Sequence, residues 1–166
     1  MYIMPRTEIQ DSERQEVGEF IERHWHSKMV VVRGQSLFPH QEQGLLERRE
    51  GRLAGLLTYR IVGDTMEVLT LNSILAGQGI GSSLMLNAIE KARKRNCRRV
   101  CLTTTNDNLR AMGFYQRLGF RITAVHVGAV DEARRIKPEI PKVGERGIEI
   151  HDEISMELAL EPYLGA

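Results

Sequence analysis

Three glycines alternate with other residues in the stretch Leu71–Leu84, which reads LNSILAGQGIGSSL. Before the glycines, the run Met66–Leu71 mixes β-branched and apolar residues over the length of a strand. After them, apolar residues recur at helical spacing, at Ile80, Leu84, Ala88 and Ala92. The sequence therefore predicts a strand, a glycine loop and a helix in direct succession.

The glycine loop is suited to hold a phosphate group. The first turn of a helix has N–H groups without partners inside the helix, and the helix macrodipole places partial positive charge there. Gly77, Gly79 and Gly81 allow a phosphorylated ligand to approach these amides closely. We therefore expect an anionic cofactor at the start of this helix.

Spacing separates the known kinds of phosphate loop. A nucleotide P-loop needs a Lys-Ser/Thr pair after its last glycine, but Gly81 is followed by Ser82 and Ser83. The dinucleotide fingerprint needs another glycine three residues after its second one, where this chain has Ser82 or Leu84. The sequence Gly-Gln-Gly-Ile-Gly-Ser instead resembles the pyrophosphate loop of the GNAT superfamily of N-acetyltransferases, which bind acetyl-coenzyme A. A glycine-rich turn without a ligand is the plainer alternative.

A second segment resembles the same family. Residues Thr105–Phe120 read TNDNLRAMGFYQRLGF and are similar to the family pattern Asn-x-x-Ala-x-x-x-Tyr-x-x-x-Gly-Phe. Asn108, Ala111 and Tyr115 fall on one helix face, at i, i+3 and i+7. The resemblance implies that Asn108 hydrogen-bonds the pantetheine arm, that Ala111 leaves room for this arm, and that Tyr115 lies near the cofactor sulfur.

The resemblance also implies roles in catalysis. We expect acetyl-CoA as co-substrate, no metal, and Tyr115 as the proton donor to the departing thiolate. Glu67 is the candidate general base, acting through water, with His126 and His151 as alternatives because imidazoles titrate near neutral pH. A backbone amide at the splayed strand end would meet the acetyl carbonyl oxygen. The residues expected to bind the cofactor are Leu71, Asn72, Ser73, Gln78, Gly79, Ile80, Gly81, Ser82, Ser83, Asn108, Ala111 and Tyr115.

One position departs from the family pattern. Many members carry Arg or Gln where this chain has Ala76, so we expect weaker cofactor binding that still rests on the amide array. The leading function is an N-acetyltransferase that acetylates a primary amine of a small molecule or a protein by direct transfer in a ternary complex. The alternative is a non-catalytic acyl-CoA binding or sensing module.

Composition limits the remaining classes. The 166 residues fit a single domain over 1–166, and a net charge of +1 offers no broad basic field for nucleic acid. Cys97 and Cys101 are too few for a disulfide framework and lack partners for zinc. Because neither a signal peptide nor a membrane-spanning apolar run is apparent, we expect a cytoplasmic enzyme without membrane or nucleic-acid partners. The oligomeric state stays open, a homodimer included.

The order of elements predicts an α/β fold, with a central mixed, mostly antiparallel sheet flanked by helices, as in the family. We expect strands over Tyr2–Ile9, Met29–Val32, Leu45–Glu50, Leu53–Val62, Thr65–Leu71, Arg99–Thr104, Phe120–Val127 and Glu153–Leu160. We expect helices from Asp11 or Ser12 to His26, over Gly79–Arg95, over Asn108–Leu118 with Asn106 or Asp107 as cap, and over Val130–Lys137. Gln35–Gln43 reads as a polar loop. The long segment Gly128–Asp152 is our candidate for recognising the acceptor.

Overall fold

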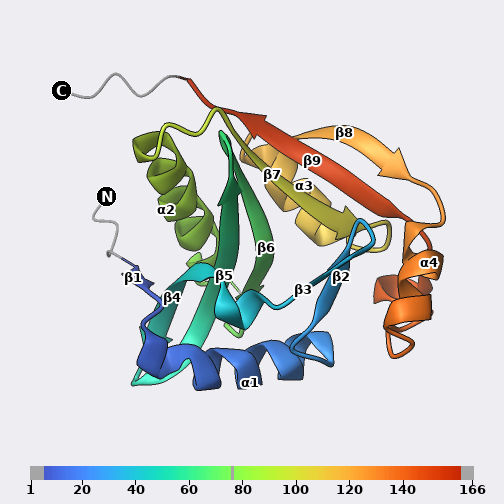
Figure 1. Ribbon diagram of the computed structural model, residues 1–166, viewed down its shortest axis with the longest axis horizontal. Coiled ribbons are helices and arrows are strands. Elements are labelled where there is room, and N and C mark those ends of the chain that lie inside the picture. Colours follow the sequence, from blue (N-terminus) through green and yellow to red (C-terminus); the bar gives the residue numbers. More distant parts are fainter. Residues whose placement is uncertain (1–5, 76, 162–166) are drawn as a thin grey trace.

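A computed structural model describes residues 6–75 and 77–161. Within them, a seven-stranded sheet forms the centre of the molecule, with the strand order β1-β4-β5-β6-β7-β9-β8 (Figure 1). The strands are β1 Thr7–Glu8, β4 Gln43–Arg49, β5 Arg52–Val62, β6 Thr65–Ser73, β7 Arg99–Thr105, β8 Arg121–His126 and β9 Glu153–Ala159. All neighbours in this sheet run antiparallel except β6 and β7. The predicted mixed α/β fold is confirmed.

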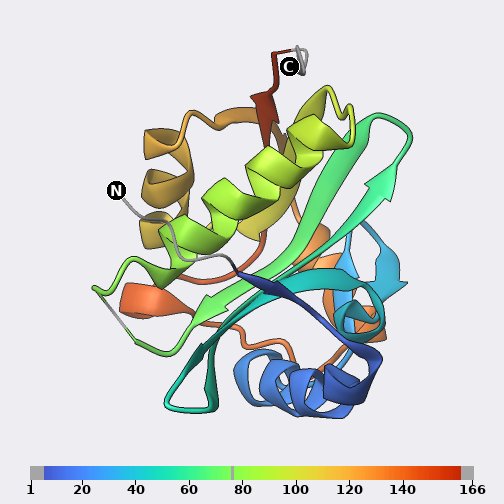
Figure 2. The same ribbon diagram turned by 90° about the vertical axis from the view of Figure 1, so that its left-hand side faces the viewer.

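Helices cover both faces of the sheet. Figure 2 shows α2 and α3 on one side of the sheet and α1 on the other. A small hairpin and α4, which contact each other, lie on the α1 side. The bounds are α1 Arg14–Trp25, α2 Ile80–Lys94, α3 Leu109–Arg117 and α4 Ala129–Ile136, with the hairpin strands β2 Val30–Val32 and β3 Gln35–Leu37.

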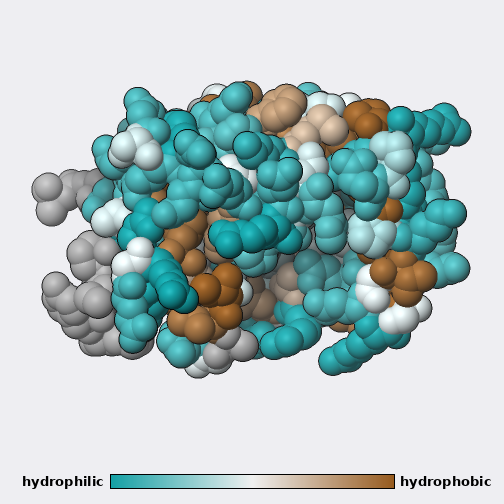
Figure 3. Space-filling model, turned by 90° about the horizontal axis from the view of Figure 1, so that it is seen from below, coloured by the Kyte–Doolittle hydropathy of each residue, from teal (hydrophilic) through white to brown (hydrophobic). Residues whose placement is uncertain are grey.

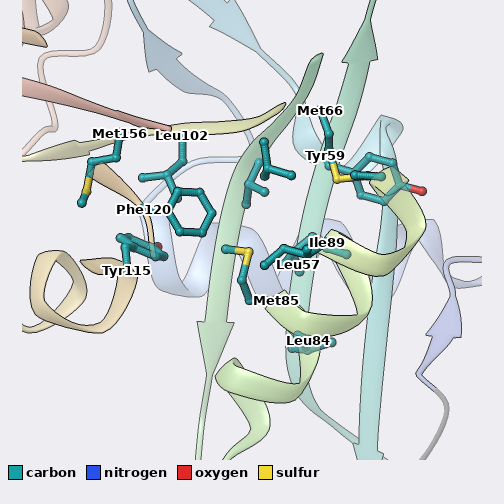
Figure 4. Packing of buried hydrophobic residues seen from close by; sticks show 14 of the residues in the cluster. Leu57, Tyr59, Met66, Leu84, Met85, Ile89, Leu102, Tyr115, Phe120 and Met156 are labelled. Atoms are coloured by element: carbon teal, nitrogen blue, oxygen red, sulfur yellow. The ribbon is translucent and has the colours of Figure 1, made fainter. Parts of the chain in front are cut away.

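The larger part of the core lies between the sheet and helices α2 and α3 (Figure 4). Apolar residues of α2 meet the sheet at the spacing that the sequence predicts, and Tyr115 and Phe120 pack near Leu102 and Met156. Burying each such side chain contributes about 1.5–3 kcal/mol. A second cluster joins α1 to the opposite face through Val17, Phe20, Ile21, Leu46, Leu53 and Leu56. Two packed layers therefore hold the central strands in place.

The sheet splits between its two parallel strands. β6 and β7 pair only from Thr65–Val68 with Arg99–Leu102, although β6 continues to Ser73 and β7 to Thr105. On the other edge of β6 the register to β5 shifts so that Leu69 is an extra residue, which makes a β-bulge. The carboxyl ends of the two strands are thus left apart, and main-chain groups of β6 beyond Val68 that face β7 have no strand partner.

Some local expectations were wrong. Gln35–Gln43 is not a plain loop, because it contains β3 and a 3₁₀ turn at Pro39–Gln41. The tight turn before β3 is made by Arg33 and Gly34, whose φ values of 51° and 75° suit a two-residue hairpin. The polar residues in this stretch led to the prediction of a loop, because only one face of the hairpin packs against the sheet.

The helix starts also differ from the prediction. A 3₁₀ turn at Asp11–Glu13 precedes α1, and Gln10 with Glu13 forms its capping box in place of an Asp11 or Ser12 cap. Asn108, rather than Asn106 or Asp107, is the N-cap residue of α3. Of the first predicted strand, Thr7–Glu8 is observed, and its beginning lies outside the described residues.

Candidate active site

A cavity of about 750 Å³ lies at the split between β6 and β7. Residues 68–73 of β6 and 102–105 of β7 line it, together with α3 on one side and the end of α1, strand β2 and α4 on the other. Seen from below, hydrophilic side chains cover most of the surface, and a hollow with apolar side chains opens near the middle (Figure 3). The cavity therefore connects the two faces of the sheet.

The glycine loop lies next to this cavity in the chain but is not part of its lining. Gly79 is the N-cap of α2 with a φ of 71°, and no side chain caps the helix. The amide of Ser83 bonds to the carbonyl of Gly79 at 3.0 Å, so the N–H groups of the helix residues before Ser83 are left for a ligand. A Cβ added at Gly77, Gly79 or Gly81 would meet no atom within 4 Å. The helix start is thus open, as a phosphate site requires.

The predicted face of α3 does reach the cavity. Asn108, Ala111 and Tyr115 all line it, as do Leu71, Asn72 and Ser73 of β6. Asn108 donates a hydrogen bond from Nδ2 to Thr104 Oγ1 at 3.1 Å. The Tyr115 side chain packs against the core with 9% of the residue exposed, and burial raises the pKa of its hydroxyl to about 12. Tyr115 therefore stays protonated at neutral pH.

The three candidate bases lie elsewhere. Glu67 points to Arg60, with an Arg60 Nη2–Glu67 Oε2 distance of 3.2 Å, and does not line the cavity. His126 shares a hydrogen bond with Ser155 Oγ at 2.8 Å, also away from the lining. His151 is exposed, and hydrogen bonds to Asp131 and then Glu149 raise its pKa. The structure does not bring any of the three together with Tyr115.

The wall of the cavity opposite α3 contains a buried lysine that sequence reasoning missed. Lys137 follows α4 and is only 4% exposed. Its Nζ donates to the main-chain carbonyls of Trp25 and Met29, both at 2.8 Å, and burial lowers its pKa. Lys137 thereby ties α4 to the end of α1 and to the residue before β2. A lysine before a proline in a polar segment gives no sequence signal for this role.

The segment after α4 forms a fixed wall of the cavity. Asp107, at the end of β7, accepts hydrogen bonds from Thr105 Oγ1 and from the amide of Glu145. Asn106 Oδ1 accepts hydrogen bonds from the main-chain N–H groups of His151 and Asp152, at 2.9 and 3.0 Å. Arg134 donates to the carbonyls of Ile140, Pro141 and Ile150. The long segment expected to recognise the acceptor therefore lies beside the cavity, held by Asn106 and Asp107 from outside it and by Arg134 from within it.

Comparison with known proteins establishes the family. The chain matches the Acetyltransferase (GNAT) family model over residues 7–120. It is 38% identical over 155 residues to the uncharacterized protein YdhI of Bacillus subtilis (strain 168), covering 93% of this chain and 95% of that protein. The uncharacterized N-acetyltransferase YvbK of the same strain is 30% identical over 99 residues, covering 58% of this chain and 61% of YvbK.

A solved structure shares the fold. A Bacillus subtilis acetyltransferase crystallised in complex with CoA aligns with a TM-score of 0.65 at 20% identity, covering 95% of this chain and 97% of that chain. The family match defines the class of protein: the chain belongs to the GNAT family of acetyltransferases. Within the described residues no helix is long and apolar enough to cross a membrane.

Proposed function

We propose that this acetyltransferase uses acetyl-CoA and transfers the acetyl group directly to a primary amine of a small molecule or a protein, in a ternary complex. The observation that carries the proposal is the cavity at the β6–β7 split, which Tyr115 and the wall of α1, β2 and α4 line together. Both substrates can therefore meet in one space. Neither Cys97 nor Cys101 is among its lining residues, so neither thiol is available in the cavity to carry an acyl intermediate, which supports direct transfer.

The cofactor would lie along elements that the sequence already marks. The open start of α2, with Gln78 and the amides of Gly79 to Ser82, would hold the pyrophosphate, since the Ser83 amide already bonds to the carbonyl of Gly79. The pantetheine arm would run past Leu71–Ser73 toward Asn108 and Ala111. The CoA bound to the Bacillus subtilis acetyltransferase of the same fold supports this co-substrate. Ala76, where a side-chain contact to phosphate is lost, lies outside the described residues.

Tyr115 would supply the proton that the departing thiolate needs. Its raised pKa keeps the hydroxyl protonated, and its place in the cavity lining on the α3 side supports this role. Unpaired N–H groups of β6 beyond Val68 would stabilise the oxygen that becomes negative during attack. Glu67 as base stays a prediction, and its pairing with Arg60 gives it little support.

An acetyl-CoA assay tests the proposal. Release of free CoA thiol, measured with a panel of small amines and peptide N-termini, should depend on the amine. Calorimetry should show acetyl-CoA binding at the same time. Tight binding without amine-dependent thiol release would contradict transfer to an amine and favour an acyl-CoA sensing module.

A further inference from the structure

A carboxylate at the start of β9 has an unusual environment. Glu153 lines the cavity, yet only 4% of the residue is exposed. Its Oε2 accepts the main-chain N–H of Arg33 at 3.1 Å. Over residues 6–75 and 77–161, no cation pairs with Glu153, and its Oε1 has no hydrogen-bond partner. Oε1 is not among the enclosed side-chain atoms that lack a partner in the described residues, so it is open to the cavity.

The other buried acidic residues show how this fold stabilises a carboxylate. Glu47, also 4% exposed, pairs through Oε1 with Arg6 and Arg49 at 2.8 Å. Asp107 accepts hydrogen bonds on both of its oxygens. Glu47 Oε2 has no hydrogen-bond partner either, but two arginines meet the charge of that carboxylate, and Glu47 does not line the cavity. Among these three carboxylates, Glu153 alone combines a place in the cavity lining with an oxygen that neither a cation nor a hydrogen bond meets.

The position of Glu153 suits a reacting group. In the sheet it pairs with Thr105 of β7, and the tip of the β2–β3 hairpin, at Arg33, touches it from the α1 side. Tyr115 lines the same cavity from the α3 side. A thioester whose sulfur lies near Tyr115 would thus have a carboxylate on its acceptor side. Apolar side chains of Val30, Val31, Val32, Ala133 and Ile150 line this part of the cavity.

We propose that Glu153 is a catalytic residue that binds the acceptor: Oε1 receives the ammonium group of a cationic primary amine with an apolar chain, and takes up protons from that nitrogen. The inference rests on the proposed amine acetylation and names its substrate class. An ammonium ion supplies the charge and donors that the buried carboxylate lacks, while the chain of the amine contacts the valines.

The proton balance is simple. The ammonium first loses one proton to solvent by way of Glu153, which leaves a neutral amine. The nitrogen then attacks the thioester carbon, the C–N bond forms, and the second proton passes from nitrogen to Oε1. As the C–S bond breaks, the sulfur takes the hydroxyl proton of Tyr115. The proton on Glu153 restores Tyr115 through water, so the products are the amide, CoA thiol and one proton.

Binding measurements test the proposal without turnover. The probes are propylammonium to hexylammonium and the uncharged alcohols of the same chain length, titrated into the protein in the presence of CoA. We expect the ammonium ions to bind at least about tenfold more tightly than the matched alcohols. Equal binding of both series by the parent protein would overturn the proposal, whether or not any variant folds.

Variants of β9 assign the effect to one carboxylate. Glu153→Gln keeps an oxygen for the Arg33 amide but removes the charge, and it should abolish the preference for ammonium and raise the acceptor KM about tenfold. Glu157→Gln on the same strand is the control, since Glu157 pairs with Arg99 outside the cavity. Glu153→Asp should restore part of the preference.

A Glu153→Gln protein that melts like the parent and keeps the ammonium preference would overturn the assignment. A different result would overturn the proposed function itself: with the parent protein, no amine in the panel would cause release of CoA thiol.

Discussion

The two sides of the cavity are built in different ways. The side where we propose that the cofactor binds, the cofactor side, comes from two continuous stretches, Leu71–Leu84 and Thr105–Phe120, and offers main-chain amides and small residues. The side proposed for the acceptor, the acceptor side, joins elements distant in sequence through buried polar contacts. Lys137 Nζ donates to carbonyls 112 and 108 residues away, and Glu153 accepts the amide of Arg33 across 120 residues. On this proposal the cofactor site is local in the sequence, whereas the acceptor site depends on long-range contacts.

The largest expected effect concerns the cofactor side alone. Gly81→Asp should lower acetyl-CoA affinity by about 1000-fold, because a carboxylate at the helix start repels the pyrophosphate and fills its space. The protein itself should tolerate the change, as a Cβ at Gly81 meets no atom within 4 Å. Calorimetry measures the affinity, and Gly81→Ala is the uncharged control. Equal affinity in the Asp variant and the parent would remove the phosphate site from this loop.

The next effect separates chemistry from binding. Tyr115→Phe should keep acetyl-CoA affinity and slow acetyl transfer by about 100-fold, the usual scale for a lost general acid. Tyr59→Phe is the control, because Tyr59 is a buried tyrosine that does not line the cavity. Steady-state kinetics and calorimetry measure the two quantities. Parental turnover in the Tyr115 variant would reduce this residue to a packing role.

A third substitution should weaken the acceptor side of the cavity and leave the cofactor side unchanged. Lys137→Met should lower the free energy of unfolding by about 2 kcal/mol, since the carbonyls of Trp25 and Met29 lose their buried donor. The acceptor KM should rise, with acetyl-CoA affinity unchanged. Urea denaturation and kinetics test this, with exposed Lys142→Met as control. A Lys137 variant with the stability and acceptor KM of the parent would contradict the role of this tie.

The smallest effect appears only in alkali. Because burial raises the pKa of Tyr115 to about 12 in the folded protein, against about 10 when unfolded, the unfolded state loses its proton first. The contribution of the Tyr115 hydroxyl to the free energy of unfolding is fully present below pH 10 and is lost as the pH rises toward 12. At pH 11 the free energy of unfolding is lower by about 1.4 kcal/mol for this reason. Urea denaturation of the parent and of Tyr115→Phe at several pH values measures the difference. An identical pH dependence in both proteins would show that the hydroxyl is not buried in solution.

The sequence by itself determined the fold class, the strand–loop–helix unit and the family. Periodicity marked most strands and helices to within a few residues, because alternation and helical spacing follow from which face each residue buries. The amides at the start of α2 could be inferred for the same local reason, since any helix leaves them unpaired. Asn108, Ala111 and Tyr115 share a face by spacing alone, and all three reach the cavity.

Only the tertiary structure decided the acceptor side. Glu67 is a plausible base by its place in the chain, yet the sheet pairs it with Arg60. Glu153, Asp107 and Lys137 look like ordinary surface residues in the sequence, and they are buried because distant segments close over them. A charged side chain has no periodic signature, and its environment is set by whichever partners the fold brings to it. The partners of these three residues, and therefore their chemistry, exist only once the split sheet, the hairpin and the segment after α4 have come together.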